Sequence, residues 1–277
     1  MQVVIMGGLG NKLFQIAYAH ELAGKFRARR IKLLIASQVK PNRDFLISPL
    51  LEICKHLDFS GETIYLYRLD NLVARVIRIK LLVRCLLKLL RFFSEEHSGK
   101  PFKKTLVYKG YFQNFEFSDT TMDMMQRELE NVLDRFSATP PSYSYAVVHL
   151  RRGDYSPEQQ GLLAFEYYAS ILKLHKVQEL LVFSDEYSCA LKFAKYMGFG
   201  LAMNPKDTNE WDLLQYFRNA NLVITANSSL SWWGGLLCAR TGGKVIIPSP
   251  WFRNLADFEI FCPSGFEIEK SIWVEKL

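Results

Sequence analysis

Two adjacent arginines follow an apolar stretch in the second half of the chain, in the run Val147-Val-His-Leu-Arg-Arg-Gly-Asp154. The apolar residues predict a buried strand, at the end of which Arg151 and Arg152 stand. A guanidinium presents a rigid fork of donors that matches the oxygens of a phosphate. Because two unpaired cations beside a core strand are costly to bury, the run predicts an anion site for a phosphate.

The residues around this pair are expected to differ in role. Side chains alternate along a strand, so His149 and Arg151 share one face while Arg152 faces the other. We assign the phosphate to Arg151 and expect Arg152 to pair with Asp154 or with another carboxylate. A second interpretation places both arginines in structural salt bridges. A lone strand histidine such as His149 is more typical of a satisfied core residue.

A second anion site is predicted in Ala226-Asn-Ser-Ser229, between a predicted strand and the helix after it. Asn227, Ser228 and Ser229 bring hydroxyl and backbone donors to a helix N-terminus, where the helix dipole also favours an anion. Taken alone, the segment is typical of a plain N-cap. Beside a first site at Arg151, it indicates two phosphates and hence a diphosphate.

Two acidic positions are candidates for further contacts with a nucleotide. Asp185 and Glu186 follow a predicted strand and are also typical of acids in the first turn of a helix. A carboxylate at Asp212, on the preceding helix, would accept two hydrogen bonds from guanine N1–H and N2–H₂, which other bases do not offer. No His, Cys and Asp spacing in the sequence is typical of a metal site, and we expect no metal and no cofactor.

A glycine-rich turn in the first half, Gly7-Gly-Leu-Gly-Asn11, links a predicted strand to a helix, as at the start of a Rossmann-like unit. Glycines such as Gly10 would let a ligand approach the backbone, and Asn11 would supply a polar group. The spacing is not GxGxxG and no Gly-Lys-Ser/Thr follows, so neither a dinucleotide fingerprint nor a P-loop is supported. A tight turn without a ligand explains the same glycines.

The elements that must position these residues alternate between short apolar runs and amphipathic helical stretches, which indicates an α/β fold. In the second half we expect strands at 145–150, 179–184, 221–225 and 243–247, and helices near 164–176, 187–198, 210–219 and 229–240. In the first half we expect strands at 3–6, 31–36 and 106–108, helices at 49–57 and 119–136 (the latter capped by Asp119 or Thr120), and a polar loop at 94–104. The proline-containing segment 138–142 predicts a linker between domains 1–138 and 139–277.

The net charge of +7 is concentrated in one segment. Residues 72–93 hold six basic residues and no acid, so the rest of the chain sums to about +1, which argues against a nucleic-acid-binding protein. The segment predicts a basic amphipathic helix that contacts an anionic membrane surface, or else one that covers a packed core or flanks an anionic substrate. Five cysteines without CxxC spacing, no signal peptide and no membrane-spanning run predict a cytoplasmic protein, peripheral on the inner membrane face where that helix binds.

Taken together, these motifs resemble those of the bacterial α-1,2-fucosyltransferases, glycosyltransferase family 11. The resemblance rests on motifs that appear in the family's order, namely Gly7–Asn11, Gly110-Tyr-Phe-Gln113, His149–Asp154, Phe183-Ser-Asp185 and Ala226-Asn-Ser-Ser-Leu-Ser-Trp-Trp-Gly234. Two departures stand out: Lys12-Leu13 replaces the usual Gln-Met, and the tryptophan often found after Asp185-Glu186 is missing.

The resemblance implies a GT-B fold, in which two Rossmann-like domains face a nucleotide-sugar cleft. It also implies GDP-fucose as donor, inversion at the anomeric carbon, no metal, and a terminal β-galactoside of an oligosaccharide as acceptor, bound against the N-terminal half. By this resemblance Arg151 would hold the β-phosphate with help from Ser228 and Ser229, His149 and Asp212 would approach the guanosine, and Asn11 would face the sugar-phosphate.

The chemistry implied is a displacement in which the acceptor 2-hydroxyl attacks C1 of fucose as GDP leaves. A preorganised arginine would stabilise the charge that builds on the β-phosphate. Asp154, Glu158 and His149 are candidate bases, and the departing phosphate oxygen is a fourth acceptor for the proton. Two alternatives remain open at this point: a fucosyltransferase of another linkage, and a non-catalytic glycan-binding module.

Overall fold

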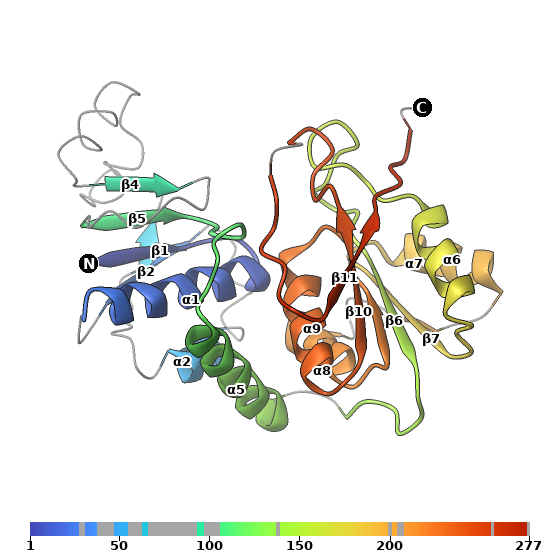
Figure 1. The fold of residues 1–277 in the computed structure, drawn as a ribbon, viewed down its shortest axis with the longest axis horizontal. Helices are drawn as coiled ribbons and strands as arrows, with labels where there is room; N and C mark the ends of the chain where they lie inside the picture. The colour runs from blue at the N-terminus through green and yellow to red at the C-terminus, as the bar shows by residue number, and fades with distance from the viewer. Residues whose placement is uncertain are drawn as a thin grey trace. The chain divides into compact units, whose positions relative to one another are not determined.

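The computed structural model describes residues 1–27, 31–37, 47–54, 63–65, 93–96, 106–136, 139–198, 201–203, 208–255 and 258–275. The chain divides into two compact units, Met1–Val132 and Leu133–Leu277, each built on its own parallel sheet (Figure 1). The predicted basic helix at 72–93 lies outside the described residues, apart from Phe93.

The first unit has a five-stranded sheet in the order β3-β2-β1-β5-β4, with every neighbouring pair parallel. The chain reverses its direction of growth across this sheet between β1 and β5, which is the topological switch point of the unit. Within the described residues the strands are β1 Gln2–Ile5, β2 Lys32–Ser37, β3 Thr63–Tyr65, β4 Phe93–Glu96 and β5 Val107–Gly110, and the helices are α1 Leu9–Lys25, α2 Ile47–Ile53 and α5 Asp119–Phe136.

The second unit has a six-stranded parallel sheet in the order β8-β7-β6-β9-β10-β11. Read in chain order this is 3-2-1-4-5-6, the doubly wound arrangement, with its switch point between β6 and β9. The strands are β6 Ala146–Leu150, β7 Leu180–Ser184, β8 Leu201–Met203, β9 Leu222–Ile224, β10 Lys244–Ser249 and β11 Phe266–Lys270, and the helices are α6 Phe165–Leu174, α7 Tyr187–Met197, α8 Glu210–Arg218 and α9 Ser229–Arg240.

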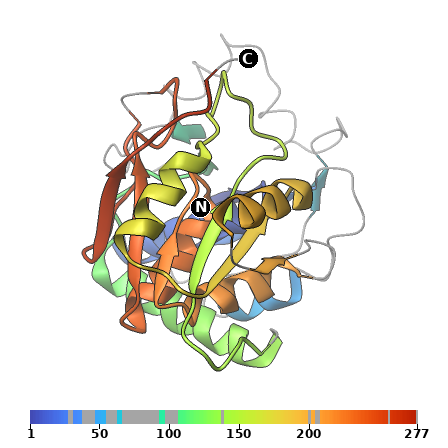
Figure 2. The same cartoon turned by 90° about the vertical axis from the view of Figure 1, so that its right-hand side faces the viewer.

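Helices cover the central strands of the second unit, which explains the composition of those strands. All five residues of β6 and all five of β7 are buried, as is typical of parallel strands covered on both faces. Apolar residues of α6 and α7 share one core cluster with residues of these strands, and Figure 2 views the unit from the side of these two helices. The ends of β6 and β7 are therefore held by a rigid, well-packed base.

The Trp-Trp-Gly part of the predicted 226–234 motif serves packing. Trp232 and Trp233 are fully buried, and Trp232 Nε1 donates to the Phe261 carbonyl at 2.7 Å. A Cβ atom at Gly234 would collide with the ring of Phe217, so glycine is required where α9 passes α8. This close approach fixes α9, whose first turn carries the Asn-Ser-Ser segment.

Most elements predicted from the sequence are confirmed. The fold is α/β, and two Rossmann-like units in series are the composition of a GT-B fold. The helix predicted at 119–136 is α5, and each strand and helix predicted in the second half is present within about two residues at either end. Among the helices of the described ranges, none combines the length and the apolar character that a membrane span requires.

Two predictions in the first unit are wrong. The predicted polar loop at 94–104 begins with three strand residues, because β4 pairs with β5 as far as Glu96. Residues 97–104 lie outside the described residues. The cap of α5 is Ser118 and neither Asp119 nor Thr120: Ser118 Oγ accepts from the Thr121 N–H at 3.4 Å, and its own N–H donates to Glu21 at 2.6 Å.

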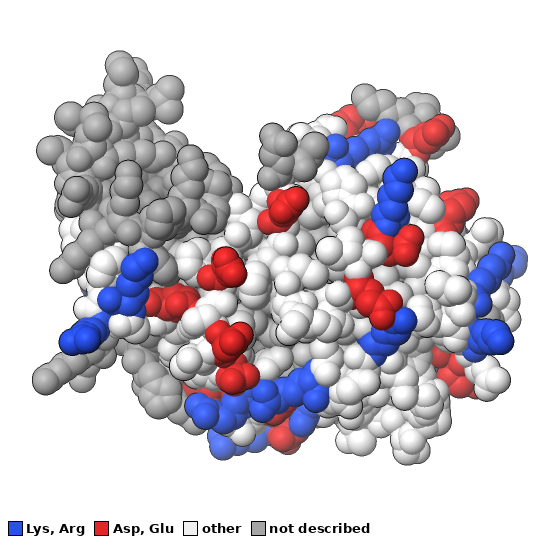
Figure 3. Space-filling model, viewed as in Figure 1, with Lys and Arg blue, Asp and Glu red and all other residues white. Residues whose placement is uncertain are grey.

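Charged side chains of both signs lie on the face that Figure 3 draws, where Lys and Arg are found beside Asp and Glu. Outside 72–93 the sequence is close to charge balance, and this surface matches that distribution.

Candidate functional site

Three predicted segments meet at the switch point of the second unit. Strand β6 pairs with β7 on one side and with β9 on the other, all parallel. The segments that follow these strands, His149–Asp154, Phe183–Glu186 and Ala226–Ser229, therefore leave the sheet at adjacent positions on the same edge. Ligands of doubly wound folds bind at this edge.

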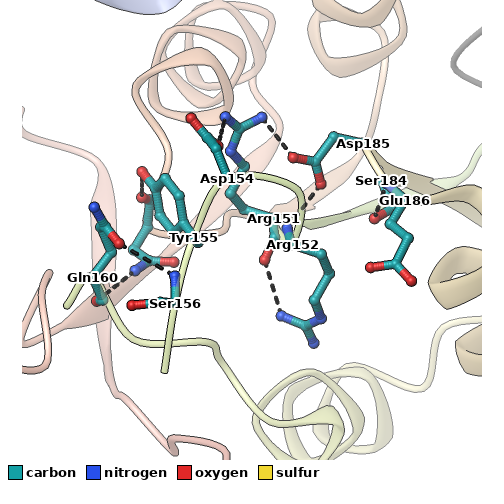
Figure 4. Close-up of polar contacts among 10 residues, drawn as sticks. Arg151, Arg152, Asp154, Tyr155, Ser156, Gln160, Ser184, Asp185 and Glu186 are labelled. Carbon is teal, nitrogen blue, oxygen red and sulfur yellow. Dashed lines mark hydrogen bonds and ion pairs between the residues drawn. The ribbon is translucent and has the colours of Figure 1, made fainter. Parts of the chain in front are cut away.

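Arg151 lies between two carboxylates (Figure 4). Its Nη1 pairs with Asp185 Oδ2 at 2.8 Å, and its Nη2 pairs with Asp154 Oδ1. The second oxygen of Asp185 accepts the backbone N–H of Arg152 at 2.8 Å. These contacts orient the guanidinium of Arg151. Its side chain is still 28% exposed, so an anion from solution can reach it.

Arg152 takes a different direction from Arg151, as strand alternation predicted, but the predicted pairing with a carboxylate is wrong. Its guanidinium donates to the carbonyls of Arg151 at 3.0 Å and Leu163 at 2.8 Å, and to Cys189 Sγ at 3.3 Å. It also lies 5.9 Å from the ring of Phe165 at the start of α6. The side chain therefore satisfies backbone acceptors, while its peptide N–H is the group that meets a carboxylate.

His149 is a buried, neutral histidine. It is 4% exposed, its ring lies 5.9 Å from that of Phe217, and Nδ1 has no hydrogen-bond partner among the described residues. Burial lowers the pKa of His149 to about 4; the Asp185 carboxylate opposes this shift, while Arg151 and Arg152 add to it. The imidazole is therefore uncharged near neutral pH, with one polar atom unsatisfied, unlike the satisfied core histidine of the alternative interpretation.

The loop after β6 is tied to the turn after β9 by the predicted Asn227 and by two residues that were not predicted, Tyr155 and Gln160. Tyr155 Oη donates to the Asn227 carbonyl at 2.8 Å, and its ring lies 5.2 Å from the guanidinium of Arg151. Asn227 Nδ2 donates to the carbonyls of Gln160 and Gly161, each at 3.2 Å. Adjacency to the Arg-Arg-Gly-Asp run was the one signal for Tyr155, whereas nothing in the sequence singles out Gln160.

The Asn-Ser-Ser turn is not a side-chain N-cap, which was the alternative interpretation of its sequence. Asn227 and Ser228 are buried, and the side chain of Ser228, at the N-cap of α9, makes no capping hydrogen bond. Ser231 Oγ instead donates back to the carbonyls of Ala226 and Ser228, at 3.2 and 3.1 Å. The first turn of α9 and the partly exposed Ser229 thus lie at the switch point, as an anion site requires.

Asp212 is committed to the start of its own helix. It forms a capping box with Asn209: Asp212 Oδ2 accepts from the Asn209 N–H at 3.3 Å and from Nδ2 at 2.5 Å. The predicted bidentate contact with guanine would require both oxygens, so one capping hydrogen bond or more would have to be exchanged for it. Among the described residues, no three His, Cys, Asp or Glu side chains are grouped as metal ligands.

The switch point of the first unit joins the glycine turn to the Gly-Tyr-Phe-Gln segment. Gln113 Nε2 donates to Asn11 Oδ1 at 2.7 Å. The fully buried Gln15 accepts the Met6 N–H at 2.8 Å and donates to the Gly110 carbonyl at 2.9 Å, so it links the ends of β1 and β5.

Glycine is needed at the start of this turn. Gly7 has φ +84°, and a Cβ there would lie 2.9 Å from Asn11 Nδ2. Gly10 is buried in the first turn of α1. The tight-turn interpretation of these glycines therefore holds, and the turn also presents Asn11. The pairing of Asn11 with Gln113 was not predicted, because the two residues are 102 positions apart.

The sequence is similar to known glycosyltransferases over nearly its whole length. It is 26% identical over 289 residues to the O-antigen biosynthesis glycosyltransferase WbnK of Escherichia coli, covering 92% of this chain and 95% of that protein. It is 27% identical over 304 residues to an α-1,2-colitosyltransferase of Escherichia coli, covering 98% of each. Both relatives are glycosyltransferases, and both units of the chain take part in the similarity. No family model matches the sequence.

Similar solved structures include the Escherichia coli ADP-heptose LPS heptosyltransferase II, with a TM-score of 0.48 and 10% identity over 97% of this chain and 89% of that one. The Escherichia coli heptosyltransferase WaaC with ADP-2-deoxy-2-fluoro heptose has a TM-score of 0.46 and 9% identity, covering 96% of this chain and 91% of that one.

Proposed function

We propose that the chain is an inverting α-1,2-fucosyltransferase, which transfers fucose from GDP-fucose to the 2-hydroxyl of a terminal β-galactoside in O-antigen or polysaccharide synthesis. The observation that carries the proposal is that the loop holding Arg151 and the turn leading into α9 follow neighbouring strands, β6 and β9. Tyr155 joins the two, because its ring lies beside the Arg151 guanidinium and its hydroxyl donates to the Asn227 carbonyl. An arginine fork and a helix N-terminus are two anion-binding groups suited to a diphosphate. The similarity to two glycosyltransferases supports a sugar donor.

In the proposed reaction the acceptor 2-hydroxyl forms a bond to C1 of fucose while the bond from C1 to the β-phosphate oxygen breaks. The electron pair of that bond passes to the phosphate oxygen, where negative charge builds. Arg151, held in place by Asp185, stabilises this charge, and Ser228 and Ser229 assist from the turn. The hydroxyl proton goes to Asp154 or to the departing phosphate oxygen.

The remaining donor contacts are assigned by resemblance. We place the guanosine against His149 and Asp212, which requires Asp212 to exchange part of its capping box for the base. The sugar-phosphate is assigned to Asn11 and Gly10 of the first unit. The proposal needs neither a metal nor a cofactor.

A second candidate donor is a GDP-linked deoxy sugar related to fucose. One relative is named as an α-1,2-colitosyltransferase, and the similarity to it covers 98% of this chain. The diphosphate chemistry is identical for both donors, so the choice concerns only groups that contact the sugar ring. Product analysis with both donors separates them.

The test is a melting-temperature panel of the full chain with GDP, UDP, ADP and GDP-fucose, each with and without EDTA. A ligand that binds only the folded state at 100 times its Kd adds about 2.7 kcal/mol of stability. We expect GDP and GDP-fucose to raise the Tm, with no effect of EDTA, and linkage analysis to find the 1,2-product. A Tm raised by no nucleotide would instead support a non-catalytic glycan-binding module.

The basic segment 72–93 is proposed to bring the protein to an anionic membrane surface, as a peripheral cytoplasmic enzyme. Removing the charge of four residues should reduce binding to anionic liposomes, because each basic residue near such a surface contributes about 1 kcal/mol. The four residues are Lys80, Arg84, Lys88 and Arg91. Unchanged partitioning would leave the segment without a membrane role.

A further inference from the structure

We propose that Asp154 occupies, on Arg151, the place that a phosphate of the donor takes, and that the two anions exchange when the donor binds. The inference rests on the proposed function and adds to it a residue that sets donor affinity. Its basis is the difference between the two carboxylates that share one guanidinium, Asp154 and Asp185 (Figure 4).

Asp185 is the anchored partner of Arg151. Its side chain is 24% exposed, and its two oxygens accept from different groups, Arg151 Nη1 and the Arg152 N–H, both at 2.8 Å. A Cβ atom at Gly153 would collide with Asp185 Oδ2, so the glycine of the Arg-Arg-Gly-Asp run makes room for this carboxylate. Displacing Asp185 would break two hydrogen bonds in a partly buried place, which is costly.

Asp154 is the replaceable partner. Its side chain is 75% exposed, and the contact that the described residues give it is the one to Arg151 Nη2. An exposed ion pair of this kind contributes roughly 0–1 kcal/mol, because water solvates the released carboxylate well. A diphosphate offers more charge and more acceptor oxygens to the same Nη2 group.

Throughout the exchange, the positive charge of Arg151 stays paired with negative charge. Before the donor arrives, Asp154 and Asp185 share the guanidinium, so no cation is left without a partner beside the buried end of β6. After the exchange, Asp185 still fixes the orientation of Arg151, and the phosphate replaces Asp154. Asp154 therefore competes with the donor, whereas Asp185 prepares the site for it.

This division of roles predicts effects of opposite sign from two isosteric changes. Asp154→Asn removes the competing anion and should lower the Kd for GDP about threefold to fivefold, the upper part of the range for an exposed ion pair. Asp185→Asn frees Arg151 and should raise the Kd for GDP at least as much. Glu166→Gln, an exposed acid in the first turn of α6, changes the net charge equally and should leave the Kd unchanged.

The experiment is calorimetric titration of GDP into the full chain and these three variants at one fixed salt concentration. A second pair, Arg151→Gln with and without Asp154→Asn, should show no gain from removing Asp154, because the shared guanidinium is gone. Weaker or unchanged GDP binding by Asp154→Asn, or an equal gain in Glu166→Gln, would overturn the exchange. Failure of the wild-type chain to bind GDP would overturn the proposed function itself.

Discussion

Each of the two switch points of the molecule lies beside the first strand of its sheet, but the side chains at the two points differ in chemistry. At the β1/β5 point, neutral amides of Asn11, Gln15 and Gln113 hydrogen-bond to one another or to backbone ends. At the β6/β9 point, Arg151 is held by carboxylates beside a buried histidine, next to the neutral side chains of Asn227 and Ser228. In each unit the carboxyl ends of the parallel strands form an edge at which a ligand can bind. The side chains at that edge determine which chemistry it supports.

The difference indicates a division of labour under the proposed function. A fixed guanidinium can stabilise charge that develops during bond breaking, which neutral amides do less strongly. Amides fixed by each other instead orient a polar ligand without changing its charge. Variants in the second unit should therefore respond to charge and pH, and variants in the first unit should not.

The largest effect is expected for Arg151→Ala. Loss of the group that stabilises the leaving phosphate should lower kcat by 100-fold or more, about 3 kcal/mol of transition-state energy. The Tm should change little, because the side chain is partly exposed. Arg152→Ala is the contrasting variant: it leaves the carbonyls of Arg151 and Leu163 without their donor and should lower the Tm. Turnover like that of wild type in Arg151→Ala would remove the phosphate assignment.

The next effect is on the free energy of unfolding at low pH, and it is expected from a residue of the second unit, His149. The pKa of His149 is lower in the folded chain, about 4, than its ordinary value of 6.5, so the unfolded chain binds the proton first. The free energy of unfolding should therefore fall between pH 6.5 and 4, by on the order of 3 kcal/mol, and be unaffected by this group above pH 6.5.

Denaturant titrations of wild type and His149→Leu over this pH range measure the difference. The variant should lose this part of the pH dependence, whereas His175→Gln, at the end of α6, should keep it. Parallel curves for wild type and His149→Leu would contradict the assignment of a buried, neutral histidine.

The sequence predicted the second unit well for a physical reason. Strands β6 and β7 are apolar throughout because both faces are covered, and such runs are easily recognised. Strand β11 was missed because four of its five residues are exposed. Ile268 stands between two glutamates, so the segment has no apolar run. Its pairing with β10 alone makes it a strand, and this tertiary contact leaves little local pattern.

The sequence predicted which residues form the site better than it predicted which groups those residues contact. The directions of Arg151 and Arg152 followed from strand alternation, but the partners of Arg152 depended on where α6 and Cys189 pack. The capping box of Asp212 has a local signature, Asn209 three residues earlier, that was available in the sequence. The Asn11–Gln113 pair has none, because it depends on the order of strands in the sheet.

A smaller effect is expected in the first unit from Gln113→Glu. This change keeps the size of the side chain but removes the donor to Asn11 Oδ1, so the Asn11 amide loses its fixed orientation. We expect kcat/KM to fall about tenfold, as for the loss of one buried hydrogen bond. The Gln113→Glu variant should keep the fall in stability between pH 6.5 and 4 that His149 causes. A loss equal to that of Arg151→Ala would end the proposed contrast between the units.

The smallest effect is expected for Tyr155→Phe, which together with Tyr155→Leu separates the two functions of Tyr155. Tyr155→Phe keeps the ring beside Arg151 and removes the hydroxyl that donates to the Asn227 carbonyl, so kcat/KM should fall only about fivefold, the loss of one hydrogen bond. Tyr155→Leu removes the ring as well and should add a further loss of about twofold to fivefold from the cation–π contact. The two variants should differ in kcat and agree in Tm. If Phe and Leu are equivalent, the ring does not support Arg151, and the charged switch point is held by its carboxylates alone.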